Sequence, residues 1–212
     1  MAIRKFSFIP IIIILNAIVY FMWTSAKAGD TSFMAQNFLV SWDALVEGRY
    51  WTLLTSVFSH NMLFHFLINM FVLNSFGRVL EETIGSKRFI IFYLVAGILS
   101  SFVHCAVSQY YLHQPSTAAL GASGAIAGVV LLFSLLYPRE KIYLLGFIPL
   151  PAIWGALAFI GLDIWGLIEQ GHGGGLPIGH GAHLGGAFTG IFYFFFFIRV
   201  RLKGKASYNR DN

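Results

Sequence analysis

Charged residues are scarce in this sequence, and cysteine is almost absent. Asp, Glu, Lys and Arg make up 11% of the 212 residues and hydrophobic residues 57%, whereas a soluble domain carries about 25% charged residues. The single cysteine, Cys105, excludes an intramolecular disulfide. The apolar residues lie in long blocks, which is typical of a protein whose solvent is lipid. The composition therefore predicts a membrane protein.

Six segments are long or apolar enough to cross a bilayer as helices. A hydrocarbon core about 30 Å thick needs about 20 helical residues, and most of the segments have that length. They are residues 6–23, 61–80, 89–109, 123–137, 147–168 and 180–198. The sequence predicts an all-α membrane protein in which residues 1–202 form one six-transmembrane-helix bundle and residues 203–212 a short polar cytoplasmic tail.

Lys and Arg are distributed unevenly about these segments. If all six span, only Lys27 and Arg49 of the 14 basic residues lie on one side, and 14 − 2 = 12 lie on the other. An excess of Lys and Arg marks the cytoplasmic side, so both termini are predicted to be cytoplasmic. This asymmetry explains the net charge of +5 without a nucleic-acid partner, and none is expected. The first segment is interpreted as an uncleaved signal anchor.

The fourth segment is too short to cross the membrane. From Ser123 to Tyr137 there are fifteen residues, which give about 22 Å of helix and leave its first residue roughly 8 Å inside the core. The preceding stretch HQPSTAALGA is not expected to be helical. Non-helical backbone at that depth is tolerated only where protein covers it or where it lines a watery cavity. Ser123 is therefore predicted to lie submerged, at a helix N-terminus.

The sixth segment carries a histidine at matching depth. His183 is sixteen helical residues from Ile198, counting both, or about 24 Å. Gly186 and Gly190 share its helical face, and this small-xxx-small spacing lets two transmembrane backbones approach closely. If the partner is the fourth helix, the imidazole reaches the Ser123 hydroxyl. A serine beside a histidine base is the minimal activated nucleophile.

The second segment supplies two further polar side chains. His65 and Asn69 are spaced i,i+4 and share a face. Both side chains can donate hydrogen bonds to an anionic oxygen. Together with the free backbone N–H of Ser123 at the start of its helix, they are predicted to form an oxyanion hole.

The stretches FSHNMLFHFLINM, GASGAIAG and HGAHLGGAFTG resemble the rhomboid intramembrane proteases over nearly the whole chain. The matching motifs are HxxxN at His65 and Asn69, GxSG at Gly121, Ser123 and Gly124, and HxxGxxxG at His183, Gly186 and Gly190. The segment AHLGGAFTG is similar to the mitochondrial branch. That branch carries an extra N-terminal helix and a transit peptide that this sequence lacks, so the resemblance implies a six-helix prokaryotic form in the cell (inner) membrane.

The resemblance implies a serine endopeptidase that cleaves membrane protein substrates in or near a transmembrane helix, within the lipid bilayer. Ser123 is the implied nucleophile and His183 the general base and acid. His65, Asn69 and the Ser123 backbone are the implied oxyanion donors. The four motif glycines are implied to shape the structure near the site. The family uses a dyad without a required acid, metal or cofactor, and none is expected here.

Other polar residues receive structural interpretations. Many rhomboids place an aromatic residue on the catalytic imidazole four residues after the serine, where this chain has Ala127. Something else must therefore hold His183. We expect the remaining candidates to be solvent-facing (His180), interfacial (His60), bonded between helices (His104), and hydrated or in a structural hydrogen bond (Asp163). The sequence leaves open whether Asp163 or His180 assists the dyad.

Two other function classes stay open at this point. An inactive rhomboid-like protein would bind membrane clients with the same fold, but it would normally have lost the serine or the histidine. A proton or metal transporter could use His180 and His183 with His65, His60 and Asp163. Against a transporter, the sequence has no cluster of carboxylates or thiolates at midplane depth and no inverted repeat.

Overall fold

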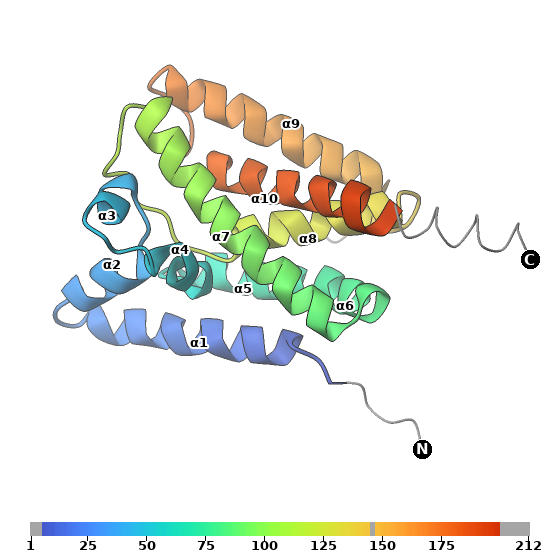
Figure 1. Cartoon of the computed structure of the whole chain (residues 1–212), viewed down its shortest axis with the longest axis horizontal. Coiled ribbons are helices and arrows are strands. Elements are labelled where there is room, and N and C mark those ends of the chain that lie inside the picture. Colours follow the sequence, from blue (N-terminus) through green and yellow to red (C-terminus); the bar gives the residue numbers. More distant parts are fainter. Residues whose placement is uncertain (1–5, 145–146, 200–212) are drawn as a thin grey trace, which may run out of the picture.

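A computed structural model describes residues 6–144 and 147–199 of the chain. In this part, five helical segments are long and apolar enough to cross a membrane, and they form one bundle (Figure 1). They are α1 (Ile9–Ala26), α5 and α6 (Leu63–Val72 and Arg78–Ile84, joined by a π-helical segment at Leu73–Gly77), α7 (Ser86–Tyr110), α9 (Ala152–Gly171), and α10 (His180–Tyr193, extended by a π-helical segment to Ile198). The predicted helical membrane bundle is confirmed at this level. The sixth span and the side on which the termini lie stay predictions.

The predicted fourth span is α8 (Ser123–Leu136), a helix of 14 residues. It is largely buried within the bundle and packs against α7 and α10. Between α1 and α5 the chain forms short helices, α2 (Ser32–Phe38), α3 (Trp42–Val46), α4 (Thr52–Thr55) and a 3-10 turn (Ser56–Phe58). These elements lie at the end of the bundle where α1 finishes (Figure 1).

The predicted fifth span begins too early. Its first residues form strand β2 (Ile148–Pro151), which pairs antiparallel with β1 (Lys141–Leu144), and the helix begins only at Ala152. The cause is local, because a residue that precedes proline is pushed out of the α region into extended backbone. Ile148 precedes Pro149 and Leu150 precedes Pro151, so this apolar run becomes a strand.

Glycines bring α8 and α10 into backbone contact. A Cβ on Gly186 would lie 1.8 Å from the carbonyl oxygen of Gly124, and one on Gly190 would lie 2.6 Å from that of Gly128. No side chain fits at these crossings, so small residues let the two helices touch. The predicted partner of the glycine face on α10 is therefore confirmed as α8, and this contact sets the distance between Ser123 and His183.

The core lies where α1, α5, α6, α7 and α8 meet, around fully buried residues such as Leu73, Leu80, Phe89 and Leu132. Large apolar side chains elsewhere point outward, among them Trp154 and Phe196. A surface rich in large apolar side chains is expected where lipid surrounds the protein. Glu81 ties α6 to the start of α1, because its carboxylate accepts from Phe8 N at 2.7 Å and from Ser7 Oγ at 2.5 Å.

Candidate active site

Ser123 and His183 face each other across the glycine contact of α8 and α10. The distance from Ser123 Oγ to His183 Nε2 is 2.9 Å, within hydrogen-bonding range. Ser123 is the first residue of α8 and His183 lies in the first turn of α10. Both side chains are partly buried. The structure therefore brings together the two residues that depth counting had placed at one level.

The non-helical chain before Ser123 is held by hydrogen bonds from other segments. Ala119 and Val40 exchange two backbone bonds of 2.8 and 3.0 Å, and Gly121 N donates to Ser56 O at 2.9 Å. His104 Nε2 lies 3.1 Å from Thr117 O. Hydrogen bonds of this kind allow irregular backbone to exist inside a membrane protein. The expectation for His104 was wrong, because its partner is this connection and not another helix.

His60 lies beneath the same turn. It is fully buried, and its Nε2 accepts a long hydrogen bond of 3.4 Å from the backbone N–H of Ala122, the residue before Ser123. Burial, helped by the nearby His65, lowers the pKa of His60 to about 3, so the ring stays neutral and keeps a lone pair for this bond. Protein encloses His60 because the segment before α5 folds under the Ser123 turn. Its interfacial level stays a prediction.

Asp163 on α9 stands behind His183. Its Oδ1 lies 3.0 Å from His183 Nδ1 and 2.7 Å from His180 Nδ1. A carboxylate oxygen accepts hydrogen bonds, so this arrangement fits the tautomer in which each Nδ1 donates to Asp163 Oδ1. His183 Nε2 is then left to accept the Ser123 hydroxyl. The ligand atoms of these three side chains all lie within 4.8 Å of one another, near enough to hold a metal ion.

One expectation fails at this cluster, because His180 is 7% exposed and does not face solvent. Asp163 is 4% exposed and takes the second of its two expected roles, since it forms hydrogen bonds with both histidines. His180 and His183 are three residues apart, so they share the face of α10 that meets α9. Gly166, one turn after Asp163, leaves room for the His180 ring, since a Cβ there would lie 2.3 Å from Nε2.

An aromatic ring contacts His183 from a position that the sequence did not reveal. The Phe159 and His183 ring centroids are 5.4 Å apart with an interplanar angle of 33°. Phe159 lies four residues before Asp163 on α9, so both reach the same face. Ala127, the position where many rhomboids carry their aromatic, is buried within α8. The contact missing there is thus supplied by α9.

The two predicted side-chain donors of the oxyanion hole differ in how close they lie to the Ser123 turn. His65 lies against Gly121, because a Cβ on that glycine would be 2.6 Å from His65 Cε1. Gly121 has a φ of +124°, which only glycine adopts readily. Asn69 is buried one turn further along, and its Nδ2 donates to His65 O at 2.8 Å within the helix. The structure therefore brings His65 to the Ser123 turn and gives Asn69 a partner in α5.

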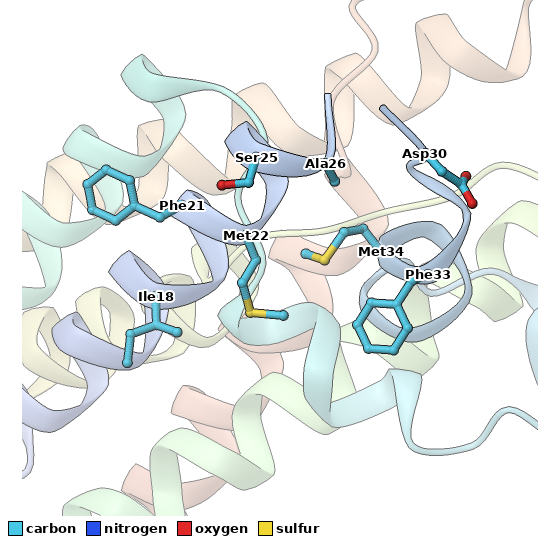
Figure 2. A pocket seen from close by; sticks show the side chains of 8 residues that line it. All are labelled: Ile18, Phe21, Met22, Ser25, Ala26, Asp30, Phe33 and Met34. Carbon is cyan, nitrogen blue, oxygen red and sulfur yellow. The ribbon is translucent and has the colours of Figure 1, made fainter. Parts of the chain in front are cut away.

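An apolar groove of about 580 Å³ lies elsewhere, between α1 and α2 (Figure 2). It is lined by Ile18, Phe21, Met22, Ser25, Ala26, Asp30, Phe33 and Met34. None of the predicted site residues belongs to this lining. The groove is therefore distinct from the Ser123–His183 pair.

The sequence matches the family model described as "Rhomboid domain" over residues 47–200. It is 36% identical to "RHOMBOID-like protein 12, mitochondrial" of Arabidopsis thaliana, over 83% of this chain and 54% of that protein. It is 32% identical to "Rhomboid protein 1, mitochondrial" of Saccharomyces cerevisiae, over 84% of this chain and 50% of that protein. The chain thus spans about half the length of these relatives.

These names correct the predicted location. The two relatives, and "Presenilin-associated rhomboid-like protein A, mitochondrial" of Danio rerio, which is 32% identical over 86% of this chain and 45% of that protein, are all mitochondrial. They point to a mitochondrial membrane, and the predicted cell membrane is wrong. That prediction depended on the lack of a transit peptide in this sequence, but a sequence half as long as its relatives carries no information about their other half.

The similarity to the mitochondrial branch seen in AHLGGAFTG is in turn confirmed. The family model covers the helices that carry Ser123, His183, His65 and Asn69, and the similarity to the relatives extends over more than four fifths of the chain. The chain belongs to the rhomboid family.

Proposed function

We propose that this protein is an intramembrane serine endopeptidase that cleaves membrane protein substrates in or near a transmembrane segment. The observation that carries this proposal is the 2.9 Å contact between Ser123 Oγ and His183 Nε2, with Asp163 Oδ1 3.0 Å behind the ring. A nucleophile, a base and a group that orients the base, all within hydrogen-bonding distance, are the signature of an activated serine.

In the proposed reaction, Ser123 Oγ attacks the scissile carbonyl while His183 Nε2 takes the hydroxyl proton. His183 then gives that proton to the leaving amine, and water releases the acyl-enzyme by the same steps. Asp163 keeps the proton of the imidazole on Nδ1 and stabilises the imidazolium that forms. The proposed machinery is thus a triad in geometry, where the resemblance alone implied a dyad.

The tetrahedral oxyanion needs donors that are in place before the reaction. The backbone N–H of Ser123 is suitable, because the first N–H groups of a helix have no intrahelical acceptor. His65 is the nearest side-chain donor, since its ring lies against Gly121. Asn69 is proposed as the third donor, because its Nδ2 has two N–H groups and only one is used in the bond to His65 O.

The substrate class follows from the depth of the site. Ser123 begins a helix of only 14 residues, so its hydroxyl lies within the membrane if the C-terminal end of α8 lies at the basic side of the bilayer. A peptide bond that reaches it belongs to a membrane-embedded segment. The same proposal includes a multi-pass protein with six spans and with both termini on the basic side of the membrane. Its reaction needs neither a metal nor a cofactor.

A serine-directed probe tests this proposal directly. The purified protein in detergent should be labelled covalently by a fluorophosphonate, and Ser123→Ala should not be. Cys105 is buried, so labelling that survives in Ser123→Ala would locate another nucleophile and contradict the proposal. A folded wild-type protein that takes no label and cleaves no single-span reporter would be an inactive, client-binding rhomboid instead.

A further inference from the structure

The cluster behind His183 consists of Asp163 and His180, and it has more polar atoms than are needed to orient the His183 ring. Asp163 Oδ1 accepts from both His180 and His183, while its Oδ2 is buried and has no hydrogen-bond partner among the described residues. An unpaired buried carboxylate oxygen costs free energy unless something binds it. With two imidazole nitrogens in reach, the missing partner has the properties of a cation.

The geometry is close to that of a zinc site. Zn²⁺ takes nitrogen and oxygen ligands at about 2.0–2.1 Å in a tetrahedron, so neighbouring ligand atoms stand about 3.3 Å apart. Here the two N···O distances are 2.7 and 3.0 Å, and all three ligand atoms lie within 4.8 Å. The two N···O distances would lengthen by a few tenths of an ångström to admit the ion, and the two histidine ligand nitrogens, at most 4.8 Å apart, would take the same spacing of about 3.3 Å.

We propose that Asp163, His180 and His183 form an inhibitory site for zinc and similar borderline-soft divalent cations. A metal bound to Nδ1 of His183 displaces the proton from that nitrogen and leaves it on Nε2. Nε2 then points an N–H at Ser123 Oγ and has no lone pair to accept the hydroxyl proton. The ion thus holds the imidazole in the wrong tautomer, and Ser123 stays unactivated.

The charge of the three side chains and the position of the cluster also favour Zn²⁺ as the bound ion. One carboxylate and two neutral imidazoles suit Zn²⁺, whereas Mg²⁺ and Ca²⁺ require oxygen ligands. His180 begins α10, two residues after the exposed chain at residues 172–178, so the cluster lies next to an exposed loop. The proposed inhibition rests on the proposed protease activity, whereas binding of the metal ion does not. Binding and inhibition are therefore measured in separate experiments.

Binding is measured without activity, on Ser123→Ala protein freed of any histidine tag. Co²⁺, which gives visible absorption bands in tetrahedral nitrogen–oxygen sites, serves as the probe. We expect one equivalent to bind with such bands and Zn²⁺ to displace it. Adding His180→Asn should abolish the bands, because the amide still donates to Asp163 but offers no ring nitrogen. The matched control is His172→Asn, an exposed histidine nearby, and it should bind like the parent.

Inhibition is measured on cleavage of a single-span reporter. Zn²⁺ should inhibit the protein with Ser123 intact, EDTA should reverse this, and Mg²⁺ should have no effect. In His180→Asn the half-inhibitory zinc concentration, relative to that variant's own zinc-free activity, should rise by at least about tenfold, since loss of even an outer partner of a ligand typically costs 10–100-fold in affinity. Cobalt bands that persist in the His180→Asn protein, or equal zinc inhibition of both forms, would overturn the proposal.

Discussion

Replacing Asp163 by asparagine removes one negative charge from behind the His183 imidazole and keeps the size of the side chain. The charge matters when His183 becomes an imidazolium in the transition state. At the 3.0 Å separation of Nδ1 and Oδ1, two unit charges attract by roughly 5 kcal/mol at an effective dielectric constant of about 20. That energy corresponds to about 10⁴ in rate. In a serine protease triad, the aspartate-to-asparagine change also costs about 10⁴-fold, but there the imidazole takes the wrong tautomer.

His180 Nδ1 also lies 2.7 Å from Asp163 Oδ1. Because this oxygen is shared between two imidazoles, we expect the loss of rate to be at or somewhat below about 10⁴-fold. An asparagine whose Oδ1 keeps both N–H bonds preserves the tautomer and loses only the charge. We therefore expect Asp163→Asn to lower turnover by about 10³–10⁴-fold, more than Asn69→Ala, whose single oxyanion donor accounts for about 10²–10³. Asp163→Glu should recover part of the activity, because it restores the carboxylate.

Steady-state cleavage of a single-span reporter in proteoliposomes measures the effect. Glu169→Gln is the control, since it neutralises a carboxylate on the same helix away from the site. Thermal unfolding in detergent confirms that each variant is folded. If folded Asp163→Asn keeps turnover within about tenfold of the parent protein, the carboxylate does not stabilise the imidazolium, and the triad geometry would have only a structural role.

Four further outcomes are expected. Ser123→Ala and His183→Ala should each abolish reporter cleavage, and the double variant should be no worse than either, since residues that act as a unit are non-additive; residual cleavage by Ser123→Ala would contradict the mechanism. His65→Ala should lower kcat by about 10²–10³ with little change in KM, which steady-state kinetics resolves. Gly186→Ala should lower the Tm in detergent markedly, because its methyl group would lie 1.8 Å from a backbone oxygen, whereas Gly161→Ala, in open space, should not. Activity should survive dialysis against EDTA, and a loss that zinc restores would refute a metal-free mechanism.

The sequence by itself indicated a protein surrounded by lipid, gave most of the spans and predicted that Ser123 and His183 lie at one level. Helix rise is a fixed 1.5 Å per residue, so counting inward from the charged ends located Ser123 and His183 at one depth. The spacing of Gly186 and Gly190 then indicated a close helix contact, which α8 provides. These features are local or periodic, and a single chain displays them directly. The fifth span begins later than predicted, because Pro149 and Pro151 push the residues before them into extended backbone.

Only the tertiary structure decided what surrounds His183. Depth counting gives a height along each helix but not the direction in which a residue points around it, and that direction depends on how α9 and α10 pack. Asp163 and Phe159 lie on the face of α9 that meets His183, although nothing near them in sequence marks that face. His60 reached the Ala122 N–H through a chain reversal before α5, a long-range contact with no local signal. The nucleophile and base follow from patterns along the chain, whereas the groups that orient them follow from packing between helices.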